Sequence, residues 1–182
     1  MKGRRGTEPI DVLVVCTGNL CRSPMIASLL GAAVPSLTVA SAGTAAPLLR
    51  PWHPLAVESL GELGHRVTGR ARKLRRADVA SAKLVLTAEG AHRAMVVRLD
   101  PSAEDRAFTL LEAARLLRLA PAPAGLGAER LAAHLTAVLR ANPAEHDDDL
   151  ADPLHGDIKQ FRRTRDEIQA ALGALVPALR SA

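Results

Sequence analysis

One stretch of the sequence, 10-IDVLVVCTGNLCRSP-24, joins a short β-branched run to the start of a helix. Residues 10–15 are apolar apart from Asp11, which is the pattern of a buried β-strand. Ser23 suits the N-cap position, and Pro24 suits the first turn of a helix that we expect to reach about Ala33. The stretch therefore predicts a strand, a tight loop and a helix in immediate succession.

The loop between this strand and helix has the composition of an anion site. In a parallel sheet such a loop points backbone N–H groups at whatever lies at the helix N-terminus. Gly18 relieves steric limits in so tight a curve, and Asn19 tolerates a left-handed backbone. We expect the whole loop to bind phosphate, through Thr17, Gly18, Asn19, Leu20, Cys21, Arg22 and Ser23.

Cys16 and Arg22 stand at the two ends of this loop, separated by five residues. The planar guanidinium of Arg22 can bind two phosphate oxygens at once. The N–H groups, the helix dipole and Arg22 should together stabilise a thiolate on Cys16, which could attack phosphorus and form a phosphocysteine. Ser23 could donate a hydrogen bond to the departing thiolate. The alternative is a small buried cysteine before a plain turn; a nucleoside triphosphatase is disfavoured, because the Gly-Lys-Ser/Thr ending of its loop is absent.

Asp152-Pro153, near the other end of the chain, is the complementary motif. Attack by a thiolate on a phosphate ester expels a leaving group that needs a proton, so a general acid is required. Asp152 on a loop could supply that proton and then activate the hydrolytic water. The alternative is that Asp-Pro only interrupts the chain before the last helix, since it is a common turn signal.

Strand and helix patterns alternate along the rest of the chain. Further short strands are expected at 37–42, 83–87 and 107–109, and helices at 54–63, 89–98, 110–119 and 157–179. Residues 43–54 hold three prolines and predict a loop. This alternation predicts an α/β fold with a parallel sheet and helices on both faces.

Composition limits the class of protein. Apolar residues make up 48% of the 182 residues, which excludes a wholly disordered chain. No apolar run approaches the roughly 20 residues of a membrane span, and no secretory signal is recognisable, so we expect a cytoplasmic protein without membrane insertion. Two cysteines cannot build a disulfide scaffold or a zinc site. The net charge of +5 and three aromatic residues do not predict nucleic-acid binding.

We expect one domain over residues 10–182, preceded by a flexible tail at 1–9. The segment 120–149 differs from the rest, because a Pro/Gly linker at 121–127 leads into an amphipathic helix at 129–140 and an acidic run at 147–149. We interpret it as a helical insertion. The sequence does not predict an oligomeric state.

The two motifs resemble those of the low-molecular-weight protein tyrosine phosphatase family, in its bacterial branch. Residues 14–25 are similar to the family's phosphate loop, 41–43 to its second-strand signature, 70–74 to the segment before the third strand, and 151–157 to its acid loop. The resemblance implies a three-layer, flavodoxin-like sandwich with a four-stranded parallel sheet and no cofactor or metal. It implies hydrolysis of phosphate monoesters through a phosphocysteine, with Cys16, Arg22 and Asp152 catalytic. Ser41 and Arg72 would support the loop.

Three positions depart from the family pattern. Gly69 stands where many members have a histidine that braces the loop. Leu154-His155 stand where typical members carry aromatic residues that form one wall of the phosphotyrosine slot. The opposite wall would come from Pro47-Leu48-Leu49, with Trp52 nearby. The expected slot residues are therefore Pro47, Leu48, Trp52, Leu154 and His155, and selectivity for phosphotyrosine should be poor.

Several functions remain open beside a tyrosine-phosphatase-like activity on a phosphorylated protein. A phosphatase of a small phosphate ester is the main alternative, because the aliphatic slot would admit one. A protein-arginine phosphatase is less expected, because those relatives carry threonine where this chain has Leu20. A thioredoxin-linked arsenate reductase needs further cysteines, and none follows Cys21. A phosphate-binding protein with a weak active site is a last, non-enzymatic alternative.

Overall fold

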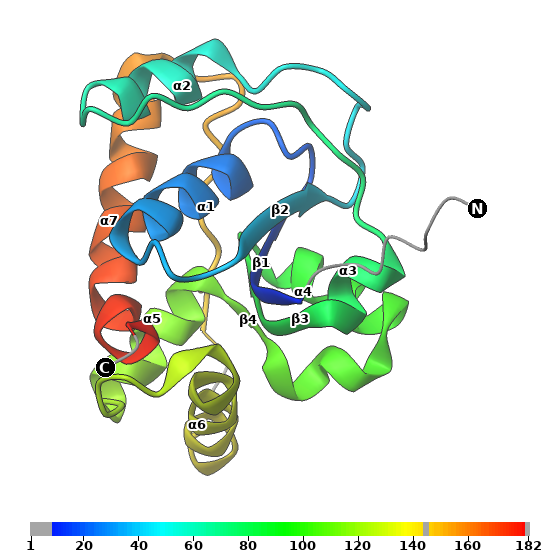
Figure 1. Ribbon diagram of the computed structural model, residues 1–182, viewed down its shortest axis with the longest axis vertical. Coiled ribbons are helices and arrows are strands. Elements are labelled where there is room, and N and C mark those ends of the chain that lie inside the picture. The colour runs from blue at the N-terminus through cyan, green and yellow to red at the C-terminus, as the bar shows by residue number, and fades with distance from the viewer. Residues whose placement is uncertain (1–8, 144–145, 181–182) are drawn as a thin grey trace.

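The computed structural model describes residues 9–143 and 146–180. Four parallel strands form its sheet in the order β2-β1-β3-β4 (Figure 1). The strands are β1 (Ile10–Cys16), β2 (Val39–Gly43), β3 (Ala82–Thr87) and β4 (Ala107–Thr109). The predicted strands are thus confirmed, with bounds that differ by at most two residues.

The helices alternate with the strands along the chain. They are α1 (Arg22–Ala33), α2 (Pro54–Gly61), α3 (Arg76–Ser81), α4 (Gly90–Leu99), the 3₁₀ helix η1 (Pro101–Arg106), α5 (Leu110–Leu119), α6 (Gly127–Ala141) and α7 (Ile158–Leu179). The sequence patterns missed α3 and η1. Each has six residues, which is too short to show a helical repeat of apolar positions.

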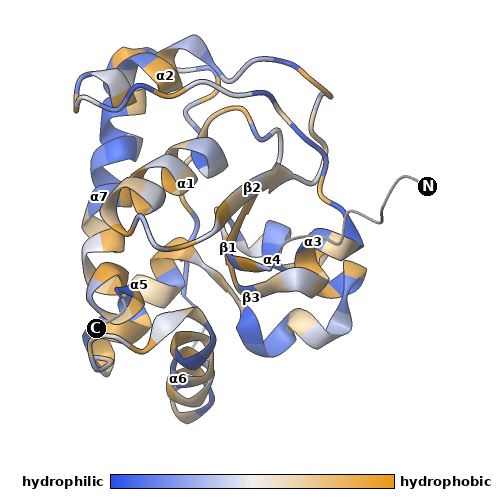
Figure 2. Ribbon diagram, in the orientation of Figure 1, coloured by the Kyte–Doolittle hydropathy of each residue, from blue (hydrophilic) through white to orange (hydrophobic). Residues whose placement is uncertain are grey.

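The sheet is covered on both faces, as the alternation of elements predicts. Val12 and Val14 of β1 face a core that is completed by α1, α5, α6 and α7. Leu13 and Val15 point to the opposite face, where α3, α4 and η1 cover them. Figures 1 and 2 show the hydrophobic strands enclosed between these two groups of helices. The fold is therefore a three-layer α/β sandwich with a four-stranded parallel sheet.

The register of the sheet brings three loops to one edge. Cys16 at the end of β1 pairs with Gly43 at the end of β2, and Val15 pairs with Thr87 at the end of β3. Ligand sites of open parallel sheets lie at the carboxyl ends of the strands. The loops after β1, β2 and β3 therefore converge where the sequence places its cysteine motif.

The tail predicted at 1–9 lies, apart from Pro9, outside the described residues. Within the segment 120–149, α6 packs against α5, α7 and β3. Its buried residues Leu131, Leu135 and Val138 join the core on the α1 side of the sheet. Among the described residues, no helix is both long enough and apolar enough to cross a membrane.

Candidate active site

Cys16 lies at the end of β1 with its sulfur held by two donors. Its side chain is 3% exposed, and its Sγ lies 3.0 Å from the Ser23 Oγ. The Asn19 backbone N–H donates to the same sulfur over 3.3 Å. The Asn19 Nδ2 donates to the Ser23 Oγ over 3.0 Å, and the hydroxyl hydrogen of Ser23 has two acceptors in reach, the sulfur at 3.0 Å and the Ala42 carbonyl oxygen at 3.5 Å.

Asn19 fixes the loop to the neighbouring strands. Its backbone has φ 51°, in the left-handed region that asparagine tolerates. Its Nδ2 also donates to the Ser41 Oγ over 2.9 Å, and its Oδ1 accepts from the Arg72 N–H over 3.0 Å. A Cβ at Gly43 would lie 2.5 Å from the Thr17 carbonyl oxygen, so only glycine allows the loop to approach β2 so closely. The structure thus brings Ser41 and Arg72 to the loop, as the resemblance implied.

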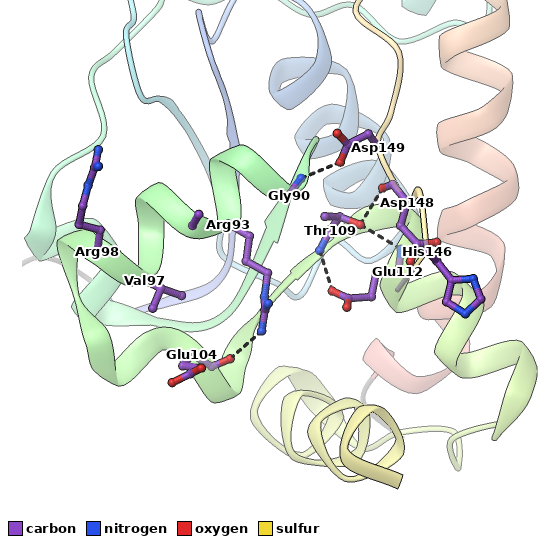
Figure 3. Close-up of a pocket in the computed structure, with 11 residues that line it drawn as sticks. Gly90, Arg93, Val97, Arg98, Glu104, Thr109, Glu112, His146, Asp148 and Asp149 are labelled. Atoms are coloured by element: carbon purple, nitrogen blue, oxygen red, sulfur yellow. Dashed lines mark hydrogen bonds between the residues drawn. The ribbon is translucent and has the colours of Figure 1, made fainter. Parts of the chain in front are cut away.

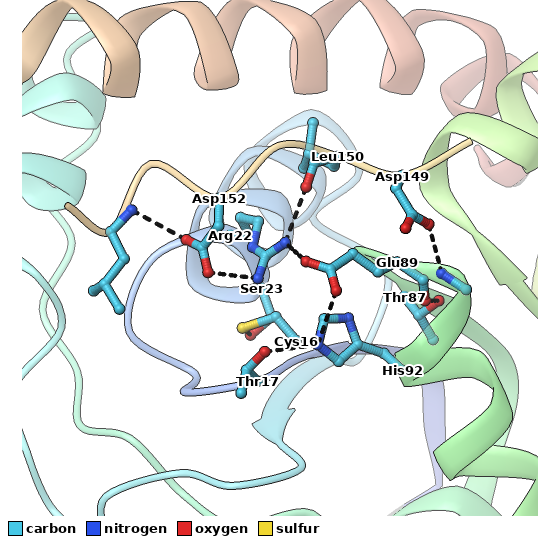
Figure 4. A network of polar contacts seen from close by, with 12 residues as sticks. Cys16, Thr17, Arg22, Ser23, Thr87, Glu89, His92, Asp149, Leu150 and Asp152 are labelled. Atoms are coloured by element: carbon cyan, nitrogen blue, oxygen red, sulfur yellow. Dashed lines mark hydrogen bonds and ion pairs between the residues drawn. The ribbon is translucent and has the colours of Figure 1, made fainter. Parts of the chain in front are cut away.

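Arg22 is buried at the first position of α1 and holds the acid loop. Its Nη2 lies 2.6 Å from the Asp152 Oδ2, and its Nη1 donates to the Leu150 carbonyl oxygen over 2.9 Å (Figure 4). Leu150 in turn donates its N–H to the Ala88 carbonyl oxygen at the end of β3. Residues 130 positions apart are thereby brought together at one edge of the sheet.

Glu89 and His92 are two site residues that sequence reasoning missed. Glu89, at the N-cap of α4, forms an ion pair with the Arg22 Nη1. The His92 Nε2 lies 2.8 Å from the Thr17 Oγ1 and 3.8 Å from the Glu89 Oε2 (Figure 4). Burial lowers the pKa of His92 below its ordinary value, and the nearby Arg22 adds to this while Glu89 opposes it. Their position directly after the buried strand β3 was the sequence feature that could have indicated them as site residues.

The second loop cysteine is a poor nucleophile. Burial, reinforced by Asp152 and Cys16 nearby, raises the pKa of Cys21 to about 12. A thiol with so high a pKa remains protonated at neutral pH and does not attack phosphorus. The burial of Cys21 therefore argues against it as the nucleophile, a distinction between the two cysteines that the sequence motif alone does not make.

A pocket of about 260 Å³ opens above the sulfur of Cys16. Its lining residues come from the phosphate loop, the loop after β2 and the acid loop: Cys16, Thr17, Gly18, Leu20, Cys21, Arg22, Ala45, Pro47, Asp152 and Leu154. None of these described lining residues is aromatic. Pro47 and Leu154 thus lie where the slot walls were expected.

Leu48, Trp52 and His155 do not line this pocket, contrary to the expected slot. Leu48 is 68% exposed and His155 is also exposed. The Trp52 backbone N–H donates to the Gly69 carbonyl oxygen over 3.1 Å, and Trp52 lines a pocket behind the loop together with Asn19 and Gly69. A Cβ at Gly69 would lie 2.4 Å from the Trp52 ring, so the indole fills the space that a side chain at position 69 would occupy.

A larger pocket, of about 470 Å³, lies on the far side of the acid loop between α4 and α5 (Figure 3). No cysteine lines it. Its polar groups bind one another: the Asp149 Oδ1 accepts from the Gly90 N–H over 2.7 Å, and the Thr109 Oγ1 donates to the Asp148 carbonyl oxygen over 2.8 Å. These contacts hold the acid loop in place, and the chemistry belongs to the smaller pocket.

Comparisons with known proteins agree with this geometry. Residues 11–118 match the family described as low molecular weight phosphotyrosine protein phosphatase. A protein-arginine-phosphatase of Geobacillus stearothermophilus is 30% identical over 95% of this chain and 98% of its own length. The low molecular weight protein-tyrosine-phosphatase Etp of Escherichia coli is 37% identical over 56% of this chain and 68% of its own. The solution structure of a low molecular weight protein tyrosine phosphatase from Bacillus subtilis has a TM-score of 0.72 and 27% identity, covering 93% and 97% of the two chains.

The fold and site define an α/β phosphatase that depends on a cysteine in a loop between a strand and a helix. The chain belongs to the low molecular weight phosphotyrosine protein phosphatase family. It is a cysteine-dependent phosphatase, and its relatives include enzymes named for phosphotyrosine and for phosphoarginine.

Proposed function

We propose that Cys16 is the nucleophile of a phosphatase that works through a phosphocysteine. The observation that carries this proposal is the sulfur of Cys16 at the base of the pocket, 3.0 Å from Ser23 and within reach of Asn19. The Sγ attacks phosphorus, the bond from phosphorus to the leaving group breaks, and the phosphoryl group is left on sulfur. Water then attacks the phosphocysteine and releases inorganic phosphate and the thiolate.

Arg22 and Asp152 take complementary roles in this proposal. The guanidinium of Arg22 binds two phosphoryl oxygens, and Glu89 and Leu150 keep it oriented through its Nη1. Asp152 lies 2.6 Å from the Arg22 Nη2 and is the only carboxyl group among the residues that line the pocket. Asp152 then protonates the leaving group and afterwards takes a proton from the attacking water.

The substrate class we propose is a phosphorylated protein side chain or a small phosphate ester. The pocket walls are Ala45, Pro47, Leu20 and Leu154, which would pack against an apolar leaving group without stacking on a ring. This arrangement supports tyrosine-type chemistry with modest selectivity. A free nucleophilic thiol is maintained in a reducing compartment, so we place the reaction in the cytoplasm.

Protein-arginine phosphatase activity is the second candidate. The 30% identity with a protein-arginine-phosphatase over nearly the whole chain favours it. Leu20 opposes it, because its apolar side chain lines the pocket and offers no acceptor to the N–H groups of a phosphoarginine guanidinium. Leu20 therefore favours phosphotyrosine and other phosphate esters.

The test compares kcat/KM of the purified protein on a phosphotyrosine peptide, a phosphoarginine peptide, an alkyl phosphate and a sugar phosphate. We expect turnover of the phosphate esters and little of phosphoarginine. The variant Leu20→Thr should improve the ratio of phosphoarginine to phosphotyrosine turnover, because it places a hydroxyl in the pocket. A wild-type preference for phosphoarginine would select the second candidate. No turnover of any substrate would refute a phosphatase.

A further inference from the structure

The positive charge of the chain is concentrated in one segment. Residues 66–76 carry six basic side chains and no acidic one, so this segment alone accounts for more than the whole formal net charge of +5. The basic residues are Arg66, Arg70, Arg72, Lys73, Arg75 and Arg76. An even scatter of arginine over the surface would not produce such a run.

This segment lies beside the loop after β2, whose Pro47 lines the active-site pocket, and its own Arg70 and Arg72 line a separate pocket behind the phosphate loop. Lys73 pairs with Gly43 at the end of β2, and Arg70 lies opposite Pro51. The Ala71 N–H donates to the Arg50 carbonyl oxygen over 2.8 Å, and the Ala71 carbonyl oxygen accepts from the Leu49 N–H over 3.0 Å. Residues 49–51 follow Pro47, which lines the pocket, so the basic segment is joined to the pocket wall by backbone hydrogen bonds. Figure 2 shows hydrophilic positions along this segment, between α2 and α3.

Most of these cations lack a partner within the described part of the chain. Of the six, only Arg72 has a carboxylate within 4 Å among the described residues. We call five exposed cations without such a carboxylate the cationic strip: Arg70, Lys73, Arg75 and Arg76 of this segment and the neighbouring Arg50. Arg72, between them, is the exception and pairs with Asp78 over 2.9 Å. Elsewhere Arg115, Arg140 and Arg162 each bind a carboxylate. Like charges left together repel, and an acidic partner would relieve that repulsion.

We propose that the cationic strip binds acidic residues that flank the phosphorylated residue of a protein substrate. The proposal rests on the proposed phosphatase function and adds to it a selectivity for the residues that flank the phosphorylated one. Arg50 is three residues from Pro47, at most about 10 Å of extended chain. An acidic residue about three positions from the phosphorylated one can therefore reach the strip while the phosphoryl group occupies the loop.

The opposite rim of the pocket gives the bound chain a direction. The acid loop borders the pocket there with Asp152, and the acidic run 147–149 precedes it in the chain, with Asp148 and Asp149 on the far side of the loop and Asp147 and Asp149 exposed. An acidic segment is repelled from this rim and attracted to the strip. Acidic residues on one side of the phosphorylated residue therefore promote binding, and those on the other side do not.

A peptide suits this surface better than a nucleic acid does. Single-stranded nucleic acids are held by aromatic side chains on which bases stack, as well as by charge. Phe108 and Phe161 are buried, and Trp52 packs on Gly69. The strip offers charge without a stacking surface, which fits carboxylate side chains.

The experiment uses four phosphotyrosine peptides that differ only in flanking residues: three glutamates before the phosphotyrosine, three after it, glutamines on both sides, and lysines on both sides. At low ionic strength we expect one of the two glutamate peptides to exceed the glutamine peptide about tenfold in kcat/KM, mainly through KM. The lysine peptide should be the poorest. The preference should fade at 0.5 M salt, because exposed charges are screened there.

Two matched variants decide whether the strip is responsible. Arg50→Gln/Lys73→Gln/Arg76→Gln removes three strip charges whose side chains make no hydrogen bond among the described residues. Arg118→Gln/Arg130→Gln/Arg163→Gln removes three exposed charges from α5, α6 and α7. The strip variant should lose the preference for the glutamate peptide and keep wild-type activity on a small aryl phosphate. The control should keep both. A wild type without the preference, or equal loss in both variants, overturns the proposal.

A binding measurement separates this proposal from the proposed function. Fluorescence anisotropy of the unphosphorylated glutamate peptide reports on the strip alone, whereas turnover of an aryl phosphate reports on Cys16 chemistry alone. If the wild type binds the peptide but shows no turnover, and the strip variant loses the binding, the phosphatase is refuted and the acidic-peptide surface is retained. A single-stranded oligonucleotide, or vesicles with anionic lipid, could instead bind the wild type more tightly than the glutamate peptide does and lose that binding in the strip variant. This result would refute an acidic protein segment as the partner.

Discussion

Asn19, Ser23 and Arg22 in the phosphate loop are buried, and each side chain has at least two polar partners. The slot above them is bounded instead by Pro47 and Leu154, apolar side chains on two loops, with Leu48 and Leu49 beside it exposed by 68% and 70%. A displaced side chain in the loop leaves buried polar groups unsatisfied, which costs far more than a displaced side chain at an exposed rim. The two regions therefore differ in how much change they tolerate.

This difference separates the reaction from the choice of substrate. The loop chemistry requires one arrangement of sulfur, N–H groups and guanidinium, so few substitutions preserve it. The slot walls contribute only packing to the leaving group, so aliphatic residues can replace aromatic ones without loss of the loop. Changes in the loop should thus alter turnover of every substrate, and changes in the slot should alter the ranking of substrates.

The largest expected effect is that of Cys16→Ser. Turnover of an aryl phosphate should fall by more than about a thousandfold, because the serine hydroxyl is not ionised at neutral pH. Binding of inorganic phosphate, measured by calorimetry, should persist, because Arg22 and the backbone N–H groups remain. Cys21→Ser is the control and should keep most of the turnover, since burial holds the pKa of Cys21 at about 12. Near-wild-type hydrolysis by Cys16→Ser would exclude it as nucleophile.

The next effect depends on the leaving group. Asp152→Asn keeps a carbonyl oxygen for the Arg22 Nη2 but cannot donate the proton, so kcat on alkyl phosphates should fall by roughly a hundredfold. Nitrophenyl phosphate has a good leaving group and should lose much less. Asp149→Asn changes the same loop at the Gly90 contact and should affect both substrates alike. Equal losses on both substrates in Asp152→Asn would argue against proton donation.

Substitution in the slot should have a smaller effect, of up to about tenfold. Leu154→Phe places a ring in the pocket wall, and ring stacking contributes about 0.5–1.5 kcal/mol, so KM for aryl phosphates should fall while alkyl phosphates change little. Leu48→Phe is the matched control, because Leu48 does not line the pocket. A wild-type preference of several hundredfold for phosphotyrosine over alkyl phosphates would show that the aliphatic slot is already selective.

The contrast between loop and slot also explains what the sequence could predict. The loop is local: its strand, glycine and five-residue spacing are contiguous, and the structure places them as predicted. The predicted cap is wrong, because α1 begins at Arg22 with Cys21 at its N-cap, and the Ser23 hydroxyl contacts the Cys16 sulfur instead. The long helices and the strands were equally accessible from their periodicity. The slot joins residues 47 and 154, and its composition depends on how two loops turn, which no local pattern specifies. Trp52 illustrates this, because only the tertiary contact with Gly69 places its ring behind the loop.

Glu89 and His92 were missed for a related reason. Apart from their position just after a buried strand, at the start of α4, no sequence motif marks them. The pairing of β1 with β3 brings that helix start beside the phosphate loop, where Glu89 binds Arg22 and His92 binds Thr17. The contacts that hold the phosphate loop in place therefore depend on tertiary structure, whereas the residues for its chemistry lie in one continuous stretch of sequence.

The smallest expected effect tests this support through pH. Burial lowers the native pKa of His92, so between that value and about 6.5 the unfolded chain binds a proton that the native chain does not. Stability should therefore fall as pH decreases through about 6.5, because the native site disfavours the charged imidazole that protonation would produce beside Arg22. His53, whose pKa is also lowered by burial and by Arg50, contributes with the same sign and is present in every variant.

Urea midpoints at pH 7.5 and pH 5 should differ less in His92→Gln than in the wild type. Thr17→Val removes the hydroxyl but keeps the imidazole, so it should lower stability by about 1 kcal/mol at pH 7.5 and retain the pH dependence. An unchanged pH dependence in His92→Gln would assign the titration to another group and leave His92 as a packing residue.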